Sequence, residues 1–318
     1  MDPVDGHVVV TGVVNAQLTV PVEGFPIPYA PVRYPAGQLR MAASGVGMNV
    51  ARMLRALGSP VSLASAVGTD PAGALVRAEL ERAGLLGEGV LATTATAMSA
   101  ILVDPAGARQ INTDLKDLPE IHYPATLFRG LLEGARLAAV STIGFARPLL
   151  PLAEAARVPI AVDVQTISGP DDSYSQPWLR AADILFCSAE RLSLAPAAFA
   201  EAVLERFPAR IVVVGLGSDG CLLAVRGQPP RHIPAAAPHG VVDTTGAGDA
   251  LFAGFLHYWL ESGDPTAAAE RAVLVAGCAV GTPGTDLHAD EAYIAELLAI
   301  RREEGRVPRS GSLSSRGG

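Results

Sequence analysis

The run Asp-Thr-Thr-Gly-Ala-Gly-Asp at positions 243–249 combines residue types that can hold a phosphate group and activate a hydroxyl. It follows Val241 and Val242, which we interpret as the end of a strand, and precedes a stretch with apolar residues at helical spacing. A helix is therefore predicted to begin within Gly-Ala-Gly. Amides at a helix start lack intrahelical partners and carry the positive end of the helix dipole. Gly246 and Gly248 let an anion approach those amides closely.

Asp249 falls in the first turn of this predicted helix, beside the anion site. A carboxylate within reach of a hydroxyl and next to a phosphate cradle can act as a general base for phosphoryl transfer. The amides would take up the charge of the transferring group. The alternative interpretation is a glycine-rich turn in which Asp249 only caps the helix.

The run and its continuation through Ala250, Phe252, Ala253 and Gly254 closely resemble the C-terminal signature of the ribokinase-like (PfkB) kinase family. The order of parts is similar from the first strand to Gly284. The resemblance implies an ATP-dependent phosphotransferase that uses Mg²⁺, with Asp249 as catalytic base. It implies an anion hole formed by Gly246, Ala247 and Gly248. It also implies a monovalent cation, usually K⁺, near Asp243, Thr245 and Gly284.

A second family signature, Gly-Gly-x-Gly-x-Asn, opens a buried helix that lines the sugar pocket, and residues 44–49 resemble it. Gly45 and Asn49 match this pattern, as does the glycine at 47, whereas Ser44 replaces a glycine and Val46 stands at a commonly polar position. Glycines would let substrate hydroxyls approach the backbone, and Asn49 can both donate and accept hydrogen bonds. The alternative is a helix start in which Asn49 is a cap or a packing residue.

Asn15 and Gln17 stand where many relatives carry an Asn-x-Asp that grips substrate hydroxyls. The acceptor-only carboxylate has become an amide at Gln17, which weakens the case for ribose or fructose itself. We include both residues in the predicted substrate site. Asn15 can equally be a turn residue.

The nucleotide side departs further from the family pattern. Ser188 and Arg191 stand at the ends of the usual Asn-x-x-Glu, and Glu190 is more simply a surface charge. The loop carrying Gly217, Ser218 and Gly220 resembles the one that borders ATP, although an ordinary hairpin turn explains it too. Ala276 could leave room for the adenine ring.

Asp163 lies at the predicted carboxyl end of a strand, where relatives have an Asp-x-Asn. Open α/β sheets place ligand-binding groups at this edge. We expect Asp163 to lie near the phosphates or Mg²⁺.

Strand and helix patterns alternate along the chain, which predicts an α/β fold with a doubly wound, mostly parallel sheet and helices on both faces. Residues 1–302 would form one ribokinase-like domain. Residues 13–40, rich in Pro and Gly, and the hairpin at 96–114 would form a small β lid. Residues 303–318, rich in Arg, Ser and Gly, are expected to be a mobile tail.

Phe25, Tyr29 and Tyr34 in the predicted lid could cover a bound substrate and exclude water. They could instead pack the small sheet. Lids of relatives often pair, so the resemblance implies a homodimer through the lid.

The composition narrows the class of protein. A net charge of −8 over 318 residues provides no basic surface for nucleic acid. No run reaches the roughly 18 apolar residues of a membrane span, and the N-terminus shows no signal-peptide pattern. The three cysteines (Cys187, Cys221 and Cys278) fit reduced core thiols, so we expect a cytoplasmic protein.

The favoured function is phosphorylation of a hydroxymethyl group on a sugar or sugar-like molecule, with a nucleoside as the alternative acceptor. A nicotinamide-dependent dehydrogenase fits poorly, because residues 35–44 make a poor strand and Asn49 replaces a fingerprint glycine. A non-catalytic ligand-binding relative is a third hypothesis, motivated by Gln17, Val46 and Ser188. The sequence does not identify the acceptor.

Overall fold

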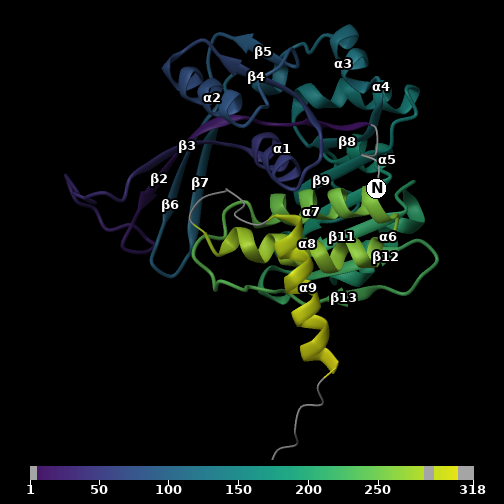
Figure 1. The fold of residues 1–318 in the computed structure, drawn as a ribbon. Helices are drawn as coiled ribbons and strands as arrows, with labels where there is room; N and C mark the ends of the chain where they lie inside the picture. The colour runs from purple at the N-terminus through teal and green to yellow at the C-terminus, as the bar shows by residue number, and fades with distance from the viewer. Residues whose placement is uncertain (1–5, 283–289, 307–318) are drawn as a thin grey trace, which may run out of the picture.

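The computed structural model describes residues 6–282 and 290–306, and its centre is a nine-stranded sheet (Figure 1). The strand order is β13-β12-β11-β10-β9-β8-β1-β4-β5, and all pairs from β11 to β5 are parallel. β12 and β13 are added as antiparallel strands at one edge. The strands are β1 (His7–Thr11), β4 (Val61–Gly68), β5 (Val90–Thr93), β8 (Ala135–Ser141), β9 (Ile160–Thr166), β10 (Ile184–Ser188), β11 (Ile211–Gly215), β12 (Cys221–Val225) and β13 (Arg231–Ile233).

Helices cover both faces of this sheet, and each face has its own apolar core. α1 (Val46–Ala56), α2 (Pro71–Arg82), α7 (Ala247–Ser262), α8 (Pro265–Val280) and α9 (Glu291–Arg306) contribute to one core. α3 (Ala125–Leu132), α4 (Leu150–Ala155), α5 (Gln176–Ala181) and α6 (Pro196–Arg206) contribute to the other. Val8 and Val10 enter the first core and Val9 the second, because successive strand residues face opposite sides. The central strands are therefore apolar on both faces.

Short 3-10 turns connect several of these elements. They are η1 (Leu118–Glu120), η2 (Gly144–Leu149), η3 (Ala189–Arg191) and η4 (Gly217–Asp219).

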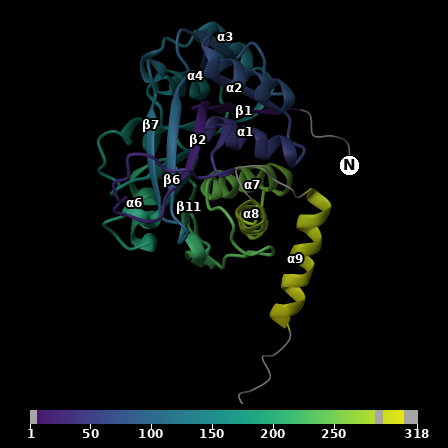
Figure 2. The same ribbon diagram turned by 90° about the vertical axis from the view of Figure 1, so that its left-hand side faces the viewer.

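A separate four-stranded sheet has the order β3-β2-β6-β7. Its strands are β2 (Asn15–Pro21), β3 (Arg40–Ser44), β6 (Met98–Val103) and β7 (Arg109–Asp114). β2 begins shortly after the carboxyl end of β1, and β6 shortly after that of β5. The small sheet therefore projects from the edge where the parallel strands end. Figures 1 and 2 show the β6–β7 hairpin running from the region of β5 toward the loop before α7.

Asp70 and Gly73 connect the small sheet to the large one. Asp70 accepts hydrogen bonds from the Thr96 hydroxyl (2.5 Å), the Thr96 amide (3.0 Å) and the Gly73 amide (2.8 Å). These bonds hold the pKa of Asp70 below its usual value. A Cβ on Gly73 would lie 2.0 Å from the carbonyl oxygen of Gly68, so α2 packs on the end of β4 backbone to backbone.

The predicted architecture is confirmed, including the mostly parallel sheet and the second small sheet. The three cysteines are buried free thiols, as expected. Within residues 6–282 and 290–306, no helix is both long and apolar enough to cross a membrane.

Three local expectations are wrong. Val241 and Val242 do not end a strand; they lie exposed in the loop before α7, although the Val242 amide donates to the Val280 carbonyl (2.8 Å). β3 forms within residues 35–44, but its antiparallel pairing in the small sheet excludes the parallel strand of a dinucleotide fold. The helix α9 continues to Arg306, into the predicted tail, and residues 307–318 lie outside the described residues.

Gly73→Ala tests the close packing of α2 on β4. The added methyl would meet the Gly68 carbonyl oxygen and the Thr96 hydroxyl, so the free energy of unfolding should fall by about 1–3 kcal/mol. Gly130→Ala is the matched control, because nothing lies within 4 Å of a Cβ there and Ala favours the helix. Urea denaturation of both variants measures the difference, and equal midpoints would contradict the packing argument.

Candidate active site

The start of α7 presents backbone amides at the edge where the parallel strands end. Gly246 precedes the helix in the left-handed conformation, with φ of 76°. Ala250 donates the first intrahelical hydrogen bond, to the Gly246 carbonyl (2.8 Å), so the amides of Ala247, Gly248 and Asp249 precede the helical ladder. Gly248 is exposed, and nothing lies within 4 Å of its ideal Cβ position. This turn can therefore accept an anion.

Asp249 is held by a residue two hundred positions away. The Asn49 side-chain amide in the first turn of α1 donates to Asp249 Oδ2 at 2.7 Å. The two helices pack through apolar side chains in one core. This hydrogen bond joins residues 44–49 to residues 243–249, the two predicted signatures. Asp249 is half-buried.

Two glycines set the position of α1. A Cβ on Gly47 would lie 2.7 Å from the carbonyl carbon of Gly12, and one on Gly12 would lie 2.9 Å from Cα of Gly47. The Gly47 amide donates to the Val13 carbonyl (2.9 Å). The start of α1 therefore sits directly on the end of β1, which brings Asn49 toward α7.

The surroundings of Asp249 raise the pKa of its carboxyl to about 7. Burial is the largest cause of this rise, the hydrogen bond from Asn49 opposes it, and the nearby charge of Asp163 adds to it. Asp163 lies near the end of β9, where its Oδ1 accepts from the Gln165 amide (2.8 Å) and burial raises its pKa to about 6. The structure thus brings together two carboxyls predicted from separate segments.

Three of the polar side chains near the ends of β1, β2 and α1 carry buried atoms without a partner. Among the described residues, Oδ1 of Asn15 and Oδ1 of Asn49 are buried without a hydrogen-bond partner, and so is the Thr11 hydroxyl. Asn15 donates to the Ser99 hydroxyl (2.9 Å), which ties β2 to β6. Because burial of an unpaired acceptor is costly, a hydrogen-bond donor that reached these oxygens would stabilise them.

The other predicted substrate residues have simpler surroundings. Gln17 is half-buried on β2 and donates to the Thr19 hydroxyl (3.3 Å). Val46, the first residue of α1, packs against the apolar core. A Cβ on Gly45 would lie 2.5 Å from the Val13 carbonyl oxygen and 3.2 Å from Asn15 Oδ1, so glycine is required there.

The predicted nucleotide residues follow neighbouring strands. Ser188 ends β10 opposite Gly215, which ends β11, so the loops after these strands are adjacent. The Ser188 hydroxyl accepts from the Glu190 amide (3.2 Å). Gly217 and Ser218 are exposed in the turn after β11, whereas a Cβ on Gly220 would lie 2.1 Å from the Ile233 carbonyl oxygen. Gly220 is thus required by the hairpin itself.

On α8, Ala276 is half-buried against the core, and the adjacent Gly277 is required by packing. A Cβ on Gly277 would lie 2.0 Å from the Ala236 carbonyl oxygen.

Two arginines that the sequence reasoning missed contact the loop before α7. Arg40 of β3 donates to Asp243 Oδ2 at 3.4 Å, and Arg109 of β7 donates to the Thr245 hydroxyl at 3.1 Å. The Thr245 amide donates to Asp243 Oδ1 (2.9 Å). No local sequence signal marks these arginines, because each meets the loop only through the fold of the small sheet. Gly284, predicted near the same cation site, lies outside the described residues.

The described residues contain no cluster of three or more His, Cys, Asp or Glu side chains able to hold a metal ion. Asp163 and Asp249 nevertheless offer the oxygen ligands that Mg²⁺ prefers. Mg²⁺ is commonly bound through one or two carboxylates together with substrate phosphates and water. The residues therefore fit a metal that arrives with a nucleotide.

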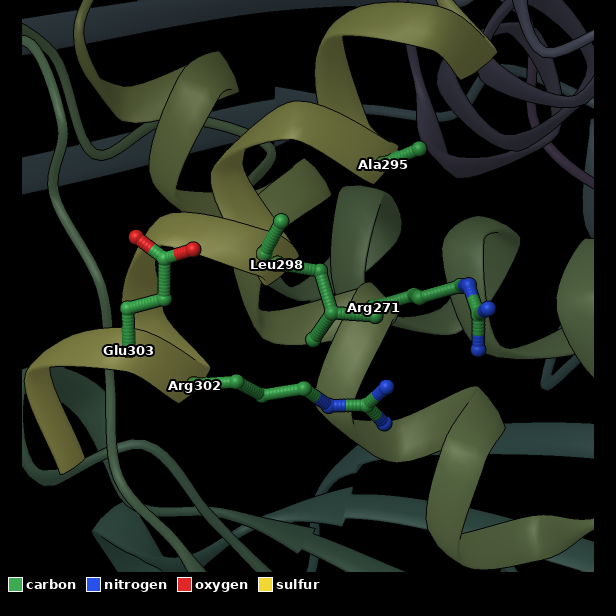
Figure 3. Close-up of a pocket in the computed structure, with 6 residues that line it drawn as sticks. Arg271, Ala295, Leu298, Arg302 and Glu303 are labelled. Carbon is green, nitrogen blue, oxygen red and sulfur yellow. The ribbon is translucent and has the colours of Figure 1, made fainter. Parts of the chain in front are cut away.

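A hollow of about 350 Å³ lies elsewhere, between α8 and α9. Figure 3 shows Arg271 and Arg302 there, with Leu298 between the helices. The Arg302 guanidinium bonds Glu270 (3.0 Å), and Arg271 lies over the Tyr258 ring. Its arginines are thus occupied by surface contacts, and none of the residues of the candidate site lines it.

Comparisons with known proteins agree with this geometry. The model of the pfkB family carbohydrate kinases matches residues 5–292. An acarbose 7(IV)-phosphotransferase of Actinoplanes is 31% identical over 85% of this chain and 90% of its own length. An ATP-dependent ribose-1-phosphate kinase of Halopiger xanaduensis is 31% identical over 93% of this chain and 99% of its own.

Solved structures show the same fold. The microbiome-derived acarbose kinase Mak1 superposes with a TM-score of 0.83 at 29% identity, covering 93% of this chain and 99% of its own. An Arabidopsis thaliana ribokinase, solved with ribose and ATP, superposes with a TM-score of 0.77 at 23% identity, covering 92% of this chain and 99% of its own.

Asn49→Ala tests the electrostatics of the site. Removing the amide that donates to Asp249 removes the hydrogen bond that lowers the pKa of its carboxyl, so that pKa should rise above about 7. Carboxyl ¹³C shifts of labelled aspartate, assigned with Asp249→Asn, follow the titration in both proteins. A carboxyl that titrates near 4 in the unsubstituted protein would contradict the proposed environment.

Proposed function

Because the chain belongs to the pfkB family of carbohydrate kinases, we propose that it transfers the γ-phosphoryl group of ATP to a hydroxymethyl group of a sugar or sugar-like molecule. The observation that carries this proposal is the Asp249 carboxyl, held by Asn49 in the first turn of α7, beside the backbone amides at the helix start. A base and an anion cradle on one helix turn are the two parts that phosphoryl transfer requires.

In the proposed reaction, Asp249 accepts the proton of the acceptor hydroxyl. The acceptor oxygen forms a bond to the γ-phosphorus while the bond from that phosphorus to the bridging oxygen of ADP breaks. The amides of Gly246, Ala247 and Gly248 donate to the phosphoryl oxygens and offset their charge. A pKa near 7 suits Asp249, because the group must be ionised before transfer and must accept a proton during it.

The acceptor site would be formed by Asn15 and Asn49, with Gln17 and Gly45 at its border. The buried Oδ1 atoms of the two asparagines need donors, and sugar hydroxyls supply them. A Cβ on Gly45 would lie 3.2 Å from Asn15 Oδ1, so glycine avoids a close contact with that oxygen. Two relatives, an acarbose 7(IV)-phosphotransferase and an ATP-dependent ribose-1-phosphate kinase, are named for carbohydrate acceptors, which supports this proposal. A nucleoside remains the alternative acceptor, since its ribose carries the same hydroxymethyl group.

ATP would lie along the edge formed by the loops after β10 and β11. Ser188, Gly217 and Ser218 border it in this proposal, and Ala276 faces the base. Mg²⁺, held by the phosphates together with Asp163, would supply further positive charge.

We extend the proposal to K⁺ at Asp243 and Thr245. Both carboxylate oxygens of Asp243 already accept hydrogen bonds, from Thr245 and Arg40, so K⁺ would share this carboxylate with a guanidinium.

We also propose that the small sheet acts as a lid and pairs with that of a second copy. Tyr29 and Tyr34 are 92% and 89% exposed and Met41 is 60% exposed, which leaves apolar surface on this sheet and its loop for a partner.

Asp249→Asn tests the reaction. The variant should lower kcat roughly 10²–10⁴-fold, because it removes the base, while nucleotide affinity stays largely unchanged. Coupled ADP release is measured over a panel of sugars, oligosaccharides and nucleosides, with and without K⁺. Asp117→Asn, an exposed aspartate, is the matched control. Unchanged turnover in Asp249→Asn would refute the mechanism, and turnover of nucleosides alone would select the alternative acceptor.

The pH dependence follows from the same group. With Asp249 as base and a pKa of about 7, kcat/KM should fall tenfold per pH unit below about 7 and level off above it. kcat/KM falls at low pH because only the ionised carboxylate can accept a proton. Initial rates between pH 5 and 9 measure the profile, and a rate that stays level down to pH 5 would exclude Asp249 as the titrating base.

A further inference from the structure

The small sheet reaches the loop before α7 through Arg109. This arginine is the first residue of β7, directly after the hairpin turn, and its Nη1 donates to the Thr245 hydroxyl at 3.1 Å. Arg40 makes a parallel contact from β3, to Asp243. Figures 1 and 2 show the β6–β7 hairpin extending toward this loop. Two cations from one sheet therefore converge on the residues that lead into the anion cradle.

The candidate site carries several carboxyl groups, whose negative charge the two arginines can offset. Asp163, Asp243 and Asp249 are all acidic, and the run 243–249 contains no basic residue. A nucleotide triphosphate adds further negative charge at the same place, so its transfer needs positive charge close to the γ-phosphoryl group.

The two arginines differ in what they bind. Arg40 faces a carboxylate, which offsets its charge. Arg109 bonds a neutral hydroxyl, and among the described residues no carboxylate pairs with it. Thr245 directly precedes Gly246, so the guanidinium of Arg109 lies beside the first residue of the cradle. Its planar fork of donors suits two phosphoryl oxygens at once.

We propose that Arg109 is a catalytic residue for the proposed phosphoryl transfer, on which this inference rests. Its guanidinium donates to the non-bridging oxygens of the γ-phosphoryl group that the Gly246–Gly248 amides hold. It exchanges no proton; it offsets the charge that spreads over these oxygens while the bond to ADP breaks and the bond to the acceptor forms.

One consequence is a coupling between the small sheet and the chemistry. Asp249 and the amides belong to α7, whereas Arg109 belongs to the sheet that also carries Asn15 of the acceptor site. The full set of charges is therefore assembled only when the sheet lies against the loop. Arg40 is a positioning residue in this arrangement, because its contact with Asp243 holds the sheet there.

Arg109→Ala and Arg109→Lys test the proposal in the full-length protein. The alanine variant should lower kcat roughly 10²–10³-fold, in the range seen when a donor to a transition-state oxyanion is removed. The Kd for ADP should change less than about threefold, because the contact strengthens only during transfer. Lysine, a point charge, should restore less than a tenth of the lost rate.

Chemical rescue separates catalysis from structure. Free guanidinium ion at millimolar concentration should raise kcat of Arg109→Ala, whereas a merely structural role would not respond. Arg82→Ala, which removes an exposed helical arginine paired with Glu79, is the matched control and should leave kcat unchanged. Thermal unfolding of each variant verifies that it folds, and Arg109→Gln replaces the alanine variant should that one fail to fold.

The outcomes distinguish this inference from the proposed function. If Asp249→Asn abolishes turnover while Arg109→Ala keeps kcat within threefold, the kinase proposal stands and the role of Arg109 is refuted. An effect confined to the KM of the acceptor would also refute it, because Arg109 would then bind the acceptor alone. If no acceptor is phosphorylated by the unsubstituted protein, both proposals fail together.

Discussion

The hydrogen bond from Asn49 to Asp249 is the contact on which the candidate site depends. It joins the first turns of α1 and α7, and so it connects the proposed acceptor side of the site to the proposed anion cradle. Its formation requires α1 to sit directly on the end of β1, which the close approach of Gly12 and Gly47 allows. It also keeps the carboxyl partly ionised, because it opposes the effect of burial on the pKa. The same hydrogen bond thus holds Asp249 in position and lowers the pKa of its carboxyl.

The large sheet holds α1 and α7 in the positions that this contact requires. Its strands are buried on both faces, and α1, α7 and α8 pack in a single core against one of them. The candidate site lies at the carboxyl edge, where loops carry polar groups without interrupting the apolar core. Acceptors such as Asn15 Oδ1 that are buried without partners lower the stability of the fold, and the apolar packing of the large sheet offsets this loss.

The small sheet contributes residues to the candidate site from both of its ends. It supplies Asn15 and Ser99 near the start of its strands, and Arg40 and Arg109 near the other end. One sheet therefore contributes residues to both the proposed acceptor side and the proposed phosphate side. Asp70 connects the start of β6 to the large sheet through its hydrogen bonds with Thr96.

The sequence by itself determined the alternation of strands and helices, because burial between two helical layers imposes apolar strands and amphipathic helices on local segments. It also predicted that a helix begins within Gly246–Gly248 with Asp249 in its first turn, since a glycine-rich helix start is a local feature. It failed at Val241 and Val242, whose apolar character indicated a strand although the chain is a loop there. Only the tertiary structure decided that Asn49 meets Asp249, that Asp163 raises its pKa, and that Arg40 and Arg109 reach the same loop. These contacts join residues up to two hundred positions apart, and no local pattern encodes them, because they depend on how the two sheets and their helices pack.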